Sequence, residues 1–424
     1  MKKRGTFFVW VSLLITINLF VLAKIYSGVG LSLTWTTASQ LVSLLGTNLL
    51  CISYILSGRF KLLDYLFGGL DKVYRIHHTT GGLAFVMLLH HPLFLIVNTL
   101  PNTELTFKYF WFSDILAYNF GVMALYLMIL LLLLTLVINL PYHIWLKTHE
   151  YMGLVLLLAS VHILTITSDV SRFAPLRYWL IAMLILGVFS AAYKKFFYKY
   201  FGPKFTYEVD EISVISDTYT IYLKPSSVAM SYYPGQYVFA SFEKLGPESH
   251  PYSIAGSGAD GKVRLSIKVL GDYTLNLKKL AVGDKAVLFG PYGNFYESLL
   301  STRDLVFVAG GIGITPFLGM LEMAKNTNKQ RIDLIYCTKN ESEMIFSHEI
   351  EKIVNISKKM TLHKFCSDDK GRISPKEILR LIGNADKKRF LLCGPQQMME
   401  DIAIGLASLG VKKRNVIFED FSFK

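Results

Sequence analysis

The stretch HHTTGGLAFVMLLHHP, residues 77–92, is an apolar run with a pair of histidines at each end. His77 and His91 are fourteen residues apart, which on an α-helix is about 21 Å along the axis and about 40° short of a whole number of turns. The two rings therefore lie on nearly one face, separated by most of the thickness of a bilayer's hydrocarbon core. Ionisable side chains at that depth are costly and mark functional sites.

A second apolar run repeats the pattern with His149 and His162, which are thirteen residues apart. Two helices with a histidine near each membrane face can hold two haems, each iron taking one imidazole from each helix. A lone histidine on an apolar helix is more often a packed core residue, but two matched pairs favour haem ligation. A spacing of thirteen leaves the second pair about 140° apart on an ideal helix. Either the helix is distorted near Gly153, or the haems are rotated relative to each other.

The composition changes near residue 200. The chain has 424 residues and is 52% hydrophobic, with long apolar runs in the first half and a globular composition in the second. The net charge of +13 comes from basic residues beside the apolar runs, which indicates membrane-flanking charges and no nucleic-acid partner. The four cysteines are scattered without a CxxC spacing, which argues against a disulfide scaffold or a zinc site.

Six membrane spans are predicted in the first half. The first run follows a basic N-terminus and is interpreted as an uncleaved helix, because no convincing cleavage site follows it. The basic clusters fall on one side of the membrane, so both termini are predicted to be cytoplasmic. A short inner turn is expected at residues 141–147. The spans are residues 7–26, 34–57, 77–100, 115–140, 148–167 and 176–197, approximately.

The third and fifth spans run in the same direction, so their histidines pair at matching depths. His77 is expected to pair with His149 on the cytoplasmic side, and His91 with His162 on the outer side. The neighbours His78 and His90 are alternatives, since His78 to His91 and His77 to His90 are also thirteen apart.

From about residue 202 the pattern changes to short alternating strands at residues 205–213, 219–224 and 264–269, separated by turns. This module is predicted to be a small antiparallel β-barrel. The final third alternates strands and helices, with strands at 304–309, 331–336 and 390–393, and is predicted to be a doubly wound α/β domain. The predicted domains are therefore 1–200, 201–299 and 300–424.

A glycine turn follows the first strand of the α/β domain. It reads GGIGITP, residues 310–316, and feeds an apolar helix. Such a turn lets backbone N–H groups approach a pyrophosphate at the helix N-terminus. The motif alone is weak, but its position after a strand and behind a barrel strengthens it. The residues expected to meet the nucleotide are Gly310, Gly311, Gly313, Thr315 and Pro316.

These motifs together resemble the NADPH oxidase and ferric reductase family, over nearly the whole chain. The family's third helix often has histidine, then glycine four residues on, then His-Pro, as His77, Gly81 and His91-Pro92 do here. Its fifth helix matches at Thr148-His149 and His162. The flavin motif H-P-[FY]-[ST] is similar to residues 250–253, the nucleotide motif to residues 310–316, and C-G-P to residues 393–395.

The resemblance implies an FAD in the barrel. Tyr252 would lie against the flavin and Ser253 would hydrogen-bond a ring nitrogen. The further residues that it implies for the flavin, its ribose or its pyrophosphate are His250, Pro251, Lys268, Gly271 and Thr274. For Lys268 a solvated strand residue is an equal alternative.

The resemblance also implies where the nicotinamide lies. Cys393, Gly394 and Pro395 end a central strand at the nicotinamide position of related reductases. The C-terminal aromatic of the family is matched by Phe421, which is expected to cover the isoalloxazine, with Phe423 as the alternative.

The preference for NADPH over NADH is predicted from the end of the second strand of the α/β domain. An acid there usually takes the ribose 2′-OH of NADH, whereas a basic group accepts a 2′-phosphate. Thr338 and Lys339 occupy this position, and no acid follows until Glu341. Lys339 is expected to accept the phosphate, with Arg372 as a further candidate. Lysine discriminates less than the planar fork of arginine, so some use of NADH is expected.

The expected activity is a transmembrane NADPH oxidase that passes electrons through FAD and two b-type haems to molecular oxygen and forms superoxide. The alternative is a ferric-chelate reductase with the same electron path. A membrane subunit that only relays electrons is a third hypothesis, and the self-contained flavin and nucleotide modules argue against it. No EF-hand pattern or Pro-rich tail is present, so no regulatory protein partner is predicted.

Overall fold

The computed structural model describes residues 4–28, 30, 32–100, 102–138, 140–257, 261–325 and 330–419. The chain divides into two compact units between Lys199 and Tyr200. We call the first the membrane unit and the second the reductase unit, and each is described by itself.

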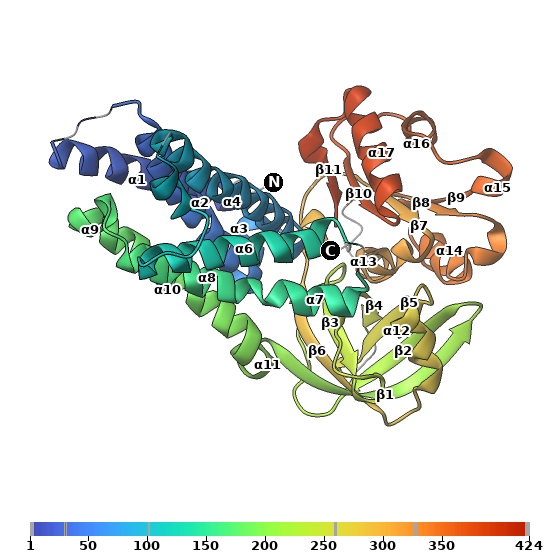
Figure 1. The fold of residues 1–424 in the computed structure, drawn as a ribbon. Coiled ribbons are helices and arrows are strands. Elements are labelled where there is room, and N and C mark those ends of the chain that lie inside the picture. Colours follow the sequence, from blue (N-terminus) through green and yellow to red (C-terminus); the bar gives the residue numbers. More distant parts are fainter. Residues whose placement is uncertain are drawn as a thin grey trace. The chain divides into compact units, whose positions relative to one another are not determined.

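Among the described residues, the membrane unit contains six helices that are long and apolar enough to cross a membrane, which confirms the predicted number (Figure 1). The fifth span consists of two consecutive helices, α7 and α8. The chain is therefore a multi-pass membrane protein. The spans are α1 (Arg4–Tyr26), α2 (Trp35–Ser57), α4 (Leu70–Thr99), α6 (Leu116–Leu136), α7 (Tyr142–Glu150) with α8 (Met152–Thr165), and α10 (Ala174–Ala192).

Two helix starts differ from the prediction. Helix α4 begins at Leu70, seven residues before His77, because Gly68 at φ 78° ends the short helix α3 (Lys61–Phe67) and Gly69 at φ 135° turns the chain. Helix α7 begins at Tyr142, where a turn was predicted, so that prediction is wrong. Pro141 directly precedes α7, and a proline is tolerated there because the first N–H groups of a helix have no intrahelical partner.

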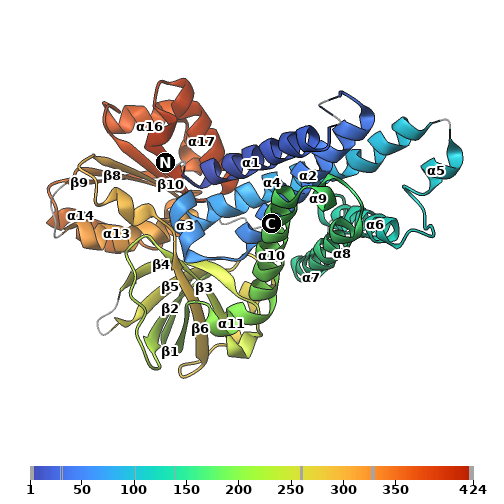
Figure 2. The same cartoon turned by 90° about the vertical axis from the view of Figure 1, so that its left-hand side faces the viewer.

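Helix α2 packs against α1, α4 and α10 (Figures 1 and 2). Polar side chains join these helices, because an unpaired polar group in an apolar bundle is costly. Asn48 donates to Thr16 Oγ1 over 2.8 Å, and the indole of Trp179 donates to the same oxygen over 2.9 Å. Lys24 forms an ion pair with Asp169, with 2.7 Å between Nζ and Oδ2, and both side chains are nearly fully buried.

The first part of the reductase unit is a closed six-stranded antiparallel barrel in the order β1-β2-β5-β4-β3-β6, which confirms the predicted barrel. Alternate residues of the strands point inward, and those of β6 read as exposed or half-buried and buried in turn. The strands are β1 (Lys204–Ile215), β2 (Thr218–Pro225), β3 (Tyr237–Phe242), β4 (His250–Ser257), β5 (Val263–Lys268) and β6 (Lys285–Tyr292).

The second part is a five-stranded parallel sheet in the order β11-β10-β7-β8-β9. One buried apolar cluster includes Phe317 of α13, and another includes Ile402 of α17, so both faces of the sheet are covered. The order and the two covered faces are those of a doubly wound nucleotide-binding domain, as predicted. Its elements are β7 (Leu305–Gly310), α13 (Thr315–Lys325), β8 (Ile332–Thr338), α14 (Ser347–Ile356), β9 (Met360–Cys366), α16 (Pro375–Ile382), β10 (Arg389–Cys393), α17 (Gln396–Ser408) and β11 (Val416–Phe418).

Strands β9 and β11 were not predicted. They form the two edges of the sheet, and β9 carries polar residues such as His363 and Lys364 between its apolar ends. An edge strand has one free side, so its sequence lacks the continuous apolar run of β7.

Candidate functional site

The membrane unit brings the four predicted histidines together in two pairs. The ring centroids of His77 and His149 are 6.2 Å apart, and those of His91 and His162 are 6.4 Å apart. A metal ion bound between two imidazoles, at about 2 Å from each nitrogen as in zinc sites, with about 1.1 Å from nitrogen to ring centre, separates the ring centres by about 6.3 Å. Both pairs have the separation that a shared metal ion requires.

Three of the four rings have the Nδ1 nitrogen fixed by a backbone carbonyl. Nδ1–H of His77 donates to the carbonyl of Ser53 over 2.8 Å, and that of His162 donates to the carbonyl of Ala117 over the same distance. For His91 the carbonyl of Ser39 lies 3.1 Å away, and the Ser39 hydroxyl is 2.7 Å from the same nitrogen. A proton on Nδ1 leaves Nε2 with its lone pair, as a metal ligand requires.

The fourth ring is held differently. His149 stacks on Trp145, with centroids 5.5 Å apart and 13° between the planes. Its Nδ1 is buried and has no hydrogen-bond partner among the described residues. The inner pair therefore has one ring oriented by a hydrogen bond and one oriented by an aromatic contact.

The neighbouring histidines that were left as alternatives are exposed. His78 and His90 lie on the outside of α4, and Nδ1 of His90 is 2.7 Å from the carbonyl of Val86 in its own helix. The structure thus pairs His77 with His149 of α7 and His91 with His162 of α8, and it leaves His78 and His90 exposed.

The spacing of thirteen between His149 and His162 is accommodated by a distorted helix. Helix α7 ends at Glu150 and α8 begins at Met152, with Tyr151 between them. The Tyr151 N–H reaches the carbonyl of Thr148, and the Leu154 N–H reaches that of Tyr151, so this turn bonds three residues back. This interruption lies two residues before Gly153. A distorted helix near Gly153 was one of the two alternatives that the sequence allowed.

Sequence reasoning missed the residues that orient the rings. Ser39 and Ser53 lie on α2 fourteen residues apart, the same spacing as His77 and His91 on the antiparallel helix α4. That matched spacing was a usable signal. Gly121 was also missed: a Cβ there would lie 3.0 Å from Nδ1 of His162, so glycine lets α6 approach the ring.

These observations fit two haems. The paired separations, the backbone acceptors at three Nδ1 atoms and the apolar helices around them are the environment that bis-histidine ligation needs. His77 and His149 would hold one haem, and His91 and His162 the other.

In the reductase unit, the residues predicted for FAD gather around strand β4 and the turn after β5. The rings of His250 and Tyr273 are 4.1 Å apart, which joins the start of β4 to the turn at residues 271–274. Thr274 Oγ1 accepts hydrogen bonds from the N–H groups of Leu270 and Gly271, so it fixes the shape of that turn. Burial lowers the pKa of His250, and the nearby Glu248 carboxylate opposes that shift.

Strand β4 presents Tyr252 next to Pro251 and Ser253. The Tyr252 hydroxyl is buried and has no hydrogen-bond partner among the described residues, and burial raises its pKa. A flavin with polar ring atoms would provide such a partner, so the residues at this site fit FAD.

The two glycine motifs of the α/β domain pack against each other at the ends of β7 and β10. A Cβ at Gly313 would lie 2.3 Å from the carbonyl oxygen of Cys393, and a Cβ at Gly394 would lie 3.0 Å from Cα of Gly310. Gly311 has φ 54°, and nothing lies within 4 Å of the position of its Cβ. The turn is therefore tight on its inner side and open on its outer side.

Helix α13 starts directly after this turn. Thr315 and Pro316 are its first residues and are buried, and the Thr315 hydroxyl donates to the carbonyl of Ile312. The predicted arrangement of strand, glycine turn and helix is present. Pro395 follows Gly394 and directly precedes α17.

Cys393 is 3% exposed, and its thiol has a raised pKa because of burial and, secondly, the Glu419 carboxylate. Glu419 is another residue that sequence reasoning missed. It is 3% exposed, and its Oε1 accepts from the Asn294 N–H over 2.9 Å. The burial of this acid depends on tertiary packing, so no local signal in the sequence indicated it. Phe421 and Phe423 lie outside the described residues.

Lys268 lies with the glycine turn of the α/β domain. It lines a pocket with Gly311 and Glu343, and its Nζ is 3.7 Å from Glu343 Oε2. The Thr338 hydroxyl donates to the carbonyl of Asn340, and Lys339 is exposed. The lysine predicted to accept a 2′-phosphate is therefore accessible at the end of β8.

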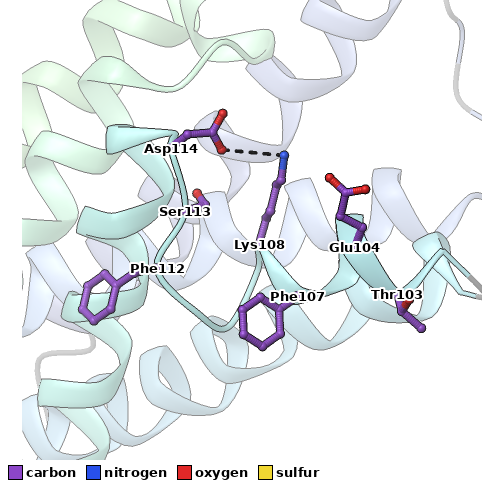
Figure 3. A pocket seen from close by; sticks show the side chains of 7 residues that line it. All are labelled: Thr103, Glu104, Phe107, Lys108, Phe112, Ser113 and Asp114. Atoms are coloured by element: carbon purple, nitrogen blue, oxygen red, sulfur yellow. Dashed lines mark ion pairs between the residues drawn. The ribbon is translucent and has the colours of Figure 1, made fainter.

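One further depression lies in the membrane unit, with a volume of about 440 Å³ (Figure 3). Lys108 and Asp114 point toward each other across it and form an ion pair of 3.6 Å, while Phe112 points away. None of the predicted site residues that the structure describes lines it. Its lining residues are Thr103, Glu104, Phe107, Lys108, Phe112, Ser113 and Asp114.

Three family patterns match the chain in succession. "Ferric reductase like transmembrane component" matches residues 42–160, which contain all four paired histidines. "FAD-binding domain" matches residues 205–333, and "Oxidoreductase NAD-binding domain" matches residues 307–403. This succession is the domain architecture of the NADPH oxidase and ferric reductase family. The chain is a transmembrane oxidoreductase with FAD- and NAD-binding domains.

Curated relatives match part of the chain. Flavohemoprotein A of Dictyostelium discoideum is 27% identical over 272 residues, covering 58% of this chain and 67% of that protein. The toluate 1,2-dioxygenase electron transfer component of Pseudomonas putida is 29% identical over 221 residues, 48% of this chain and 63% of that protein. Sulfhydrogenase 2 subunit gamma of Pyrococcus furiosus is 31% identical over 132 residues, 31% of this chain and 45% of that protein. The chain thus spans about half to two thirds of the length of these relatives.

Two solved structures are similar. The FAD/NAD-binding domain of nitric oxide dioxygenase from Vibrio cholerae is 24% identical with a TM-score of 0.45, covering 51% of this chain and 97% of that one. Flavohemoglobin from Malassezia yamatoensis is 16% identical with a TM-score of 0.54, covering 92% of this chain and 100% of that one. At this identity the second likeness concerns the fold alone.

Proposed function

We propose that this protein is a transmembrane NADPH oxidase that reduces oxygen to superoxide on the outer side of a cell membrane. The observation that carries the proposal is the pairing of four imidazoles at 6.2 and 6.4 Å on two spans. Both termini are cytoplasmic in this proposal, because the basic clusters flank one side of the bundle.

Each half of the chain has a defined task. The glycine turn at residues 310–313 receives the pyrophosphate, and the Cys393–Pro395 segment receives the nicotinamide. Strand β4 and the turn at residues 271–274 hold the flavin. FAD and haem, when bound, supply the hydride acceptance and the single-electron steps. Residues 201–299 and 300–424 act as the flavin and nucleotide domains, and residues 1–200 as the di-haem domain.

The four imidazoles would hold two haems, with two histidines on each iron. Such ligation would leave no coordination position open for oxygen as a ligand, and bound haem would supply the single-electron chemistry. Phe421 is proposed to cover the flavin face where the nicotinamide must stack, at a gain of about 0.5–1.5 kcal/mol beyond its buried area.

A ferric-chelate reductase is the second candidate, supported by the match of residues 42–160 to the ferric reductase transmembrane component. Cytochrome c reduction by the purified protein, with and without superoxide dismutase, separates the two. We expect NADPH-dependent reduction that the dismutase suppresses. Reduction that is insensitive to the dismutase, together with faster reduction of ferric citrate, would assign the chain to ferric chelates. Two haems per chain are expected by the pyridine haemochromogen assay.

A further inference from the structure

A small pocket of about 90 Å³ in the reductase unit lies between the barrel and the α/β domain. The barrel contributes the turn between β1 and β2 and the last residue of β5. The α/β domain contributes the glycine turn after β7, Tyr336 of β8 and the segment that follows β8. The residues that line it are Ser216, Asp217, Thr218, Lys268, Gly311, Ile312, Tyr336, Glu343 and Ile345.

One lysine and two carboxylates meet in this pocket. Nζ of Lys268 is 3.4 Å from Oδ2 of Asp217 and 3.7 Å from Oε2 of Glu343. The Lys268 side chain is 26% exposed and that of Glu343 is 33% exposed, so the charges are only partly screened by solvent. The three side chains together carry one net negative charge.

That charge is at odds with the ligand expected beside it. Gly311 lines the pocket with its open side, and a dinucleotide pyrophosphate is an anion that would lie at this turn. A carboxylate next to an incoming phosphate repels it, and a lysine engaged by carboxylates is not available to it. Lys268 can therefore bind a phosphate only after it loses a carboxylate partner.

Glu343 is the partner that is better placed to move. It ends the 3-10 turn Glu341–Glu343, and its ion pair with Lys268 is the longer of the two. Asp217 is held by the neighbouring Thr218 hydroxyl, which donates to its Oδ1 over 3.3 Å. Glu343 and the buried Tyr336 both line the pocket, and burial and, secondly, the Glu343 carboxylate raise the pKa of Tyr336.

We propose that Glu343 is an anionic stand-in for the pyrophosphate of the dinucleotide: it occupies Lys268 in the free enzyme and yields that lysine when NADPH binds. The proposal rests on the proposed function, because it concerns the affinity for the substrate of that reaction. Glu343 thereby lowers the affinity for the dinucleotide and links the barrel to the α/β domain while the site is empty.

The test compares the full-length protein with its Glu343→Gln variant by calorimetric titration of NADP⁺. We expect the variant to bind NADP⁺ about three- to tenfold more tightly in low salt, because one repulsive charge near the site is removed and Lys268 is released. The difference in NADP⁺ affinity between the variant and the wild type should disappear at about 0.5 M salt, because exposed charges are screened there. KM for NADPH should fall by the same factor with kcat unchanged.

Glu341→Gln is the matched control, since Glu341 begins the same 3-10 turn two residues before Glu343, pairs with Lys364 and does not line the pocket. It should leave the affinity unchanged. Lys268→Met is the second variant, and it should weaken NADP⁺ binding in the same assay. FAD content and thermal unfolding report whether each variant is folded.

Equal or weaker binding of NADP⁺ by a folded Glu343→Gln variant would overturn the proposal alone. If Glu343→Gln loses its flavin, the Lys268→Met variant provides the test. An unchanged affinity of that variant for NADP⁺ would then overturn the proposal. An absence of NADP⁺ and NADPH binding in every protein, wild type included, would overturn the proposed function together with this inference.

Discussion

The membrane unit and the reductase unit present their chemistry in different ways. In the membrane unit four imidazole side chains carry the proposed site, and backbone carbonyls of neighbouring helices orient three of them. In the reductase unit the backbone itself forms the nucleotide site, where Gly313 and Gly394 leave no room for a Cβ. The membrane site should therefore fail when a side chain is removed, and the nucleotide site should fail when a side chain is added.

The largest expected effect is the loss of a haem on removing a ligand. His91→Ala or His162→Ala should reduce the haem content from two to about one per chain and abolish oxygen reduction, because one imidazole cannot replace a bis-histidine site. Transfer of electrons from NADPH to flavin should remain. Haem content and dye reduction measure the two outcomes.

His90→Ala is the control for these variants, because His90 is adjacent to His91 and exposed. It should keep both haems. A His91→Ala/His162→Ala double variant that still carries two haems per chain would refute the ligand assignment.

The second effect is steric and concerns the reductase unit. Gly313→Ala should destabilise the flavin and nucleotide domains by about 1–3 kcal/mol or more, because its Cβ meets a backbone oxygen that cannot turn away. Gly319→Ala, in helix α13, is the control, since its Cβ would find neighbours only at 3.5 Å or beyond. Thermal unfolding followed by flavin fluorescence compares them, and equal melting temperatures would contradict the tight-turn account.

The third effect concerns Lys339, a side chain in the reductase unit, where the nucleotide site is otherwise formed by the backbone. Lys339→Ala should raise KM for NADPH by about three- to tenfold, since an exposed lysine–phosphate contact contributes about 1 kcal/mol. KM for NADH should stay unchanged, because NADH lacks the 2′-phosphate. Steady-state kinetics with both nucleotides checks the difference, and equal changes would eliminate the phosphate role of Lys339.

The smallest effect is an expected lack of reactivity. Burial raises the pKa of Cys393 and raises that of Cys337 to about 12, so both thiols stay protonated at pH 8. Iodoacetamide requires a thiolate and should leave both unmodified in the folded protein, while half-buried Cys366 is the comparison. Peptide mass spectrometry before and after unfolding measures this. Rapid labelling of Cys393 at pH 8 would show that its thiol is open and ionised.

The sequence predicted much of the fold because the signals were local. The length of the apolar runs predicted six spans, and the alternation of apolar and polar residues predicted β1, β2 and β5. The glycine turn predicted the start of α13. The prediction failed where a short-range signal was weak. The start of α7 followed a proline that reads as a turn, and β9 has the mixed composition of an edge strand.

The candidate site in the membrane unit likewise has features that local sequence signals predicted and features that only packing decided. The sequence alone placed histidines at matched depths, but His77 and His78 have nearly identical local patterns. Only the packing of α4 against α2 decided that His77 faces inward and reaches Ser53.

The sequence by itself determined which residues can do the chemistry: four histidines on two apolar spans, an HPYS motif, and two glycine motifs after strands. Those are properties of residue type and spacing. The tertiary structure decided which groups meet: which carbonyl orients each imidazole, how Tyr151 interrupts the fifth span, and that Lys268 pairs with Glu343. These contacts join residues far apart in the chain, and their geometry depends on how whole helices and strands pack, which no local pattern encodes.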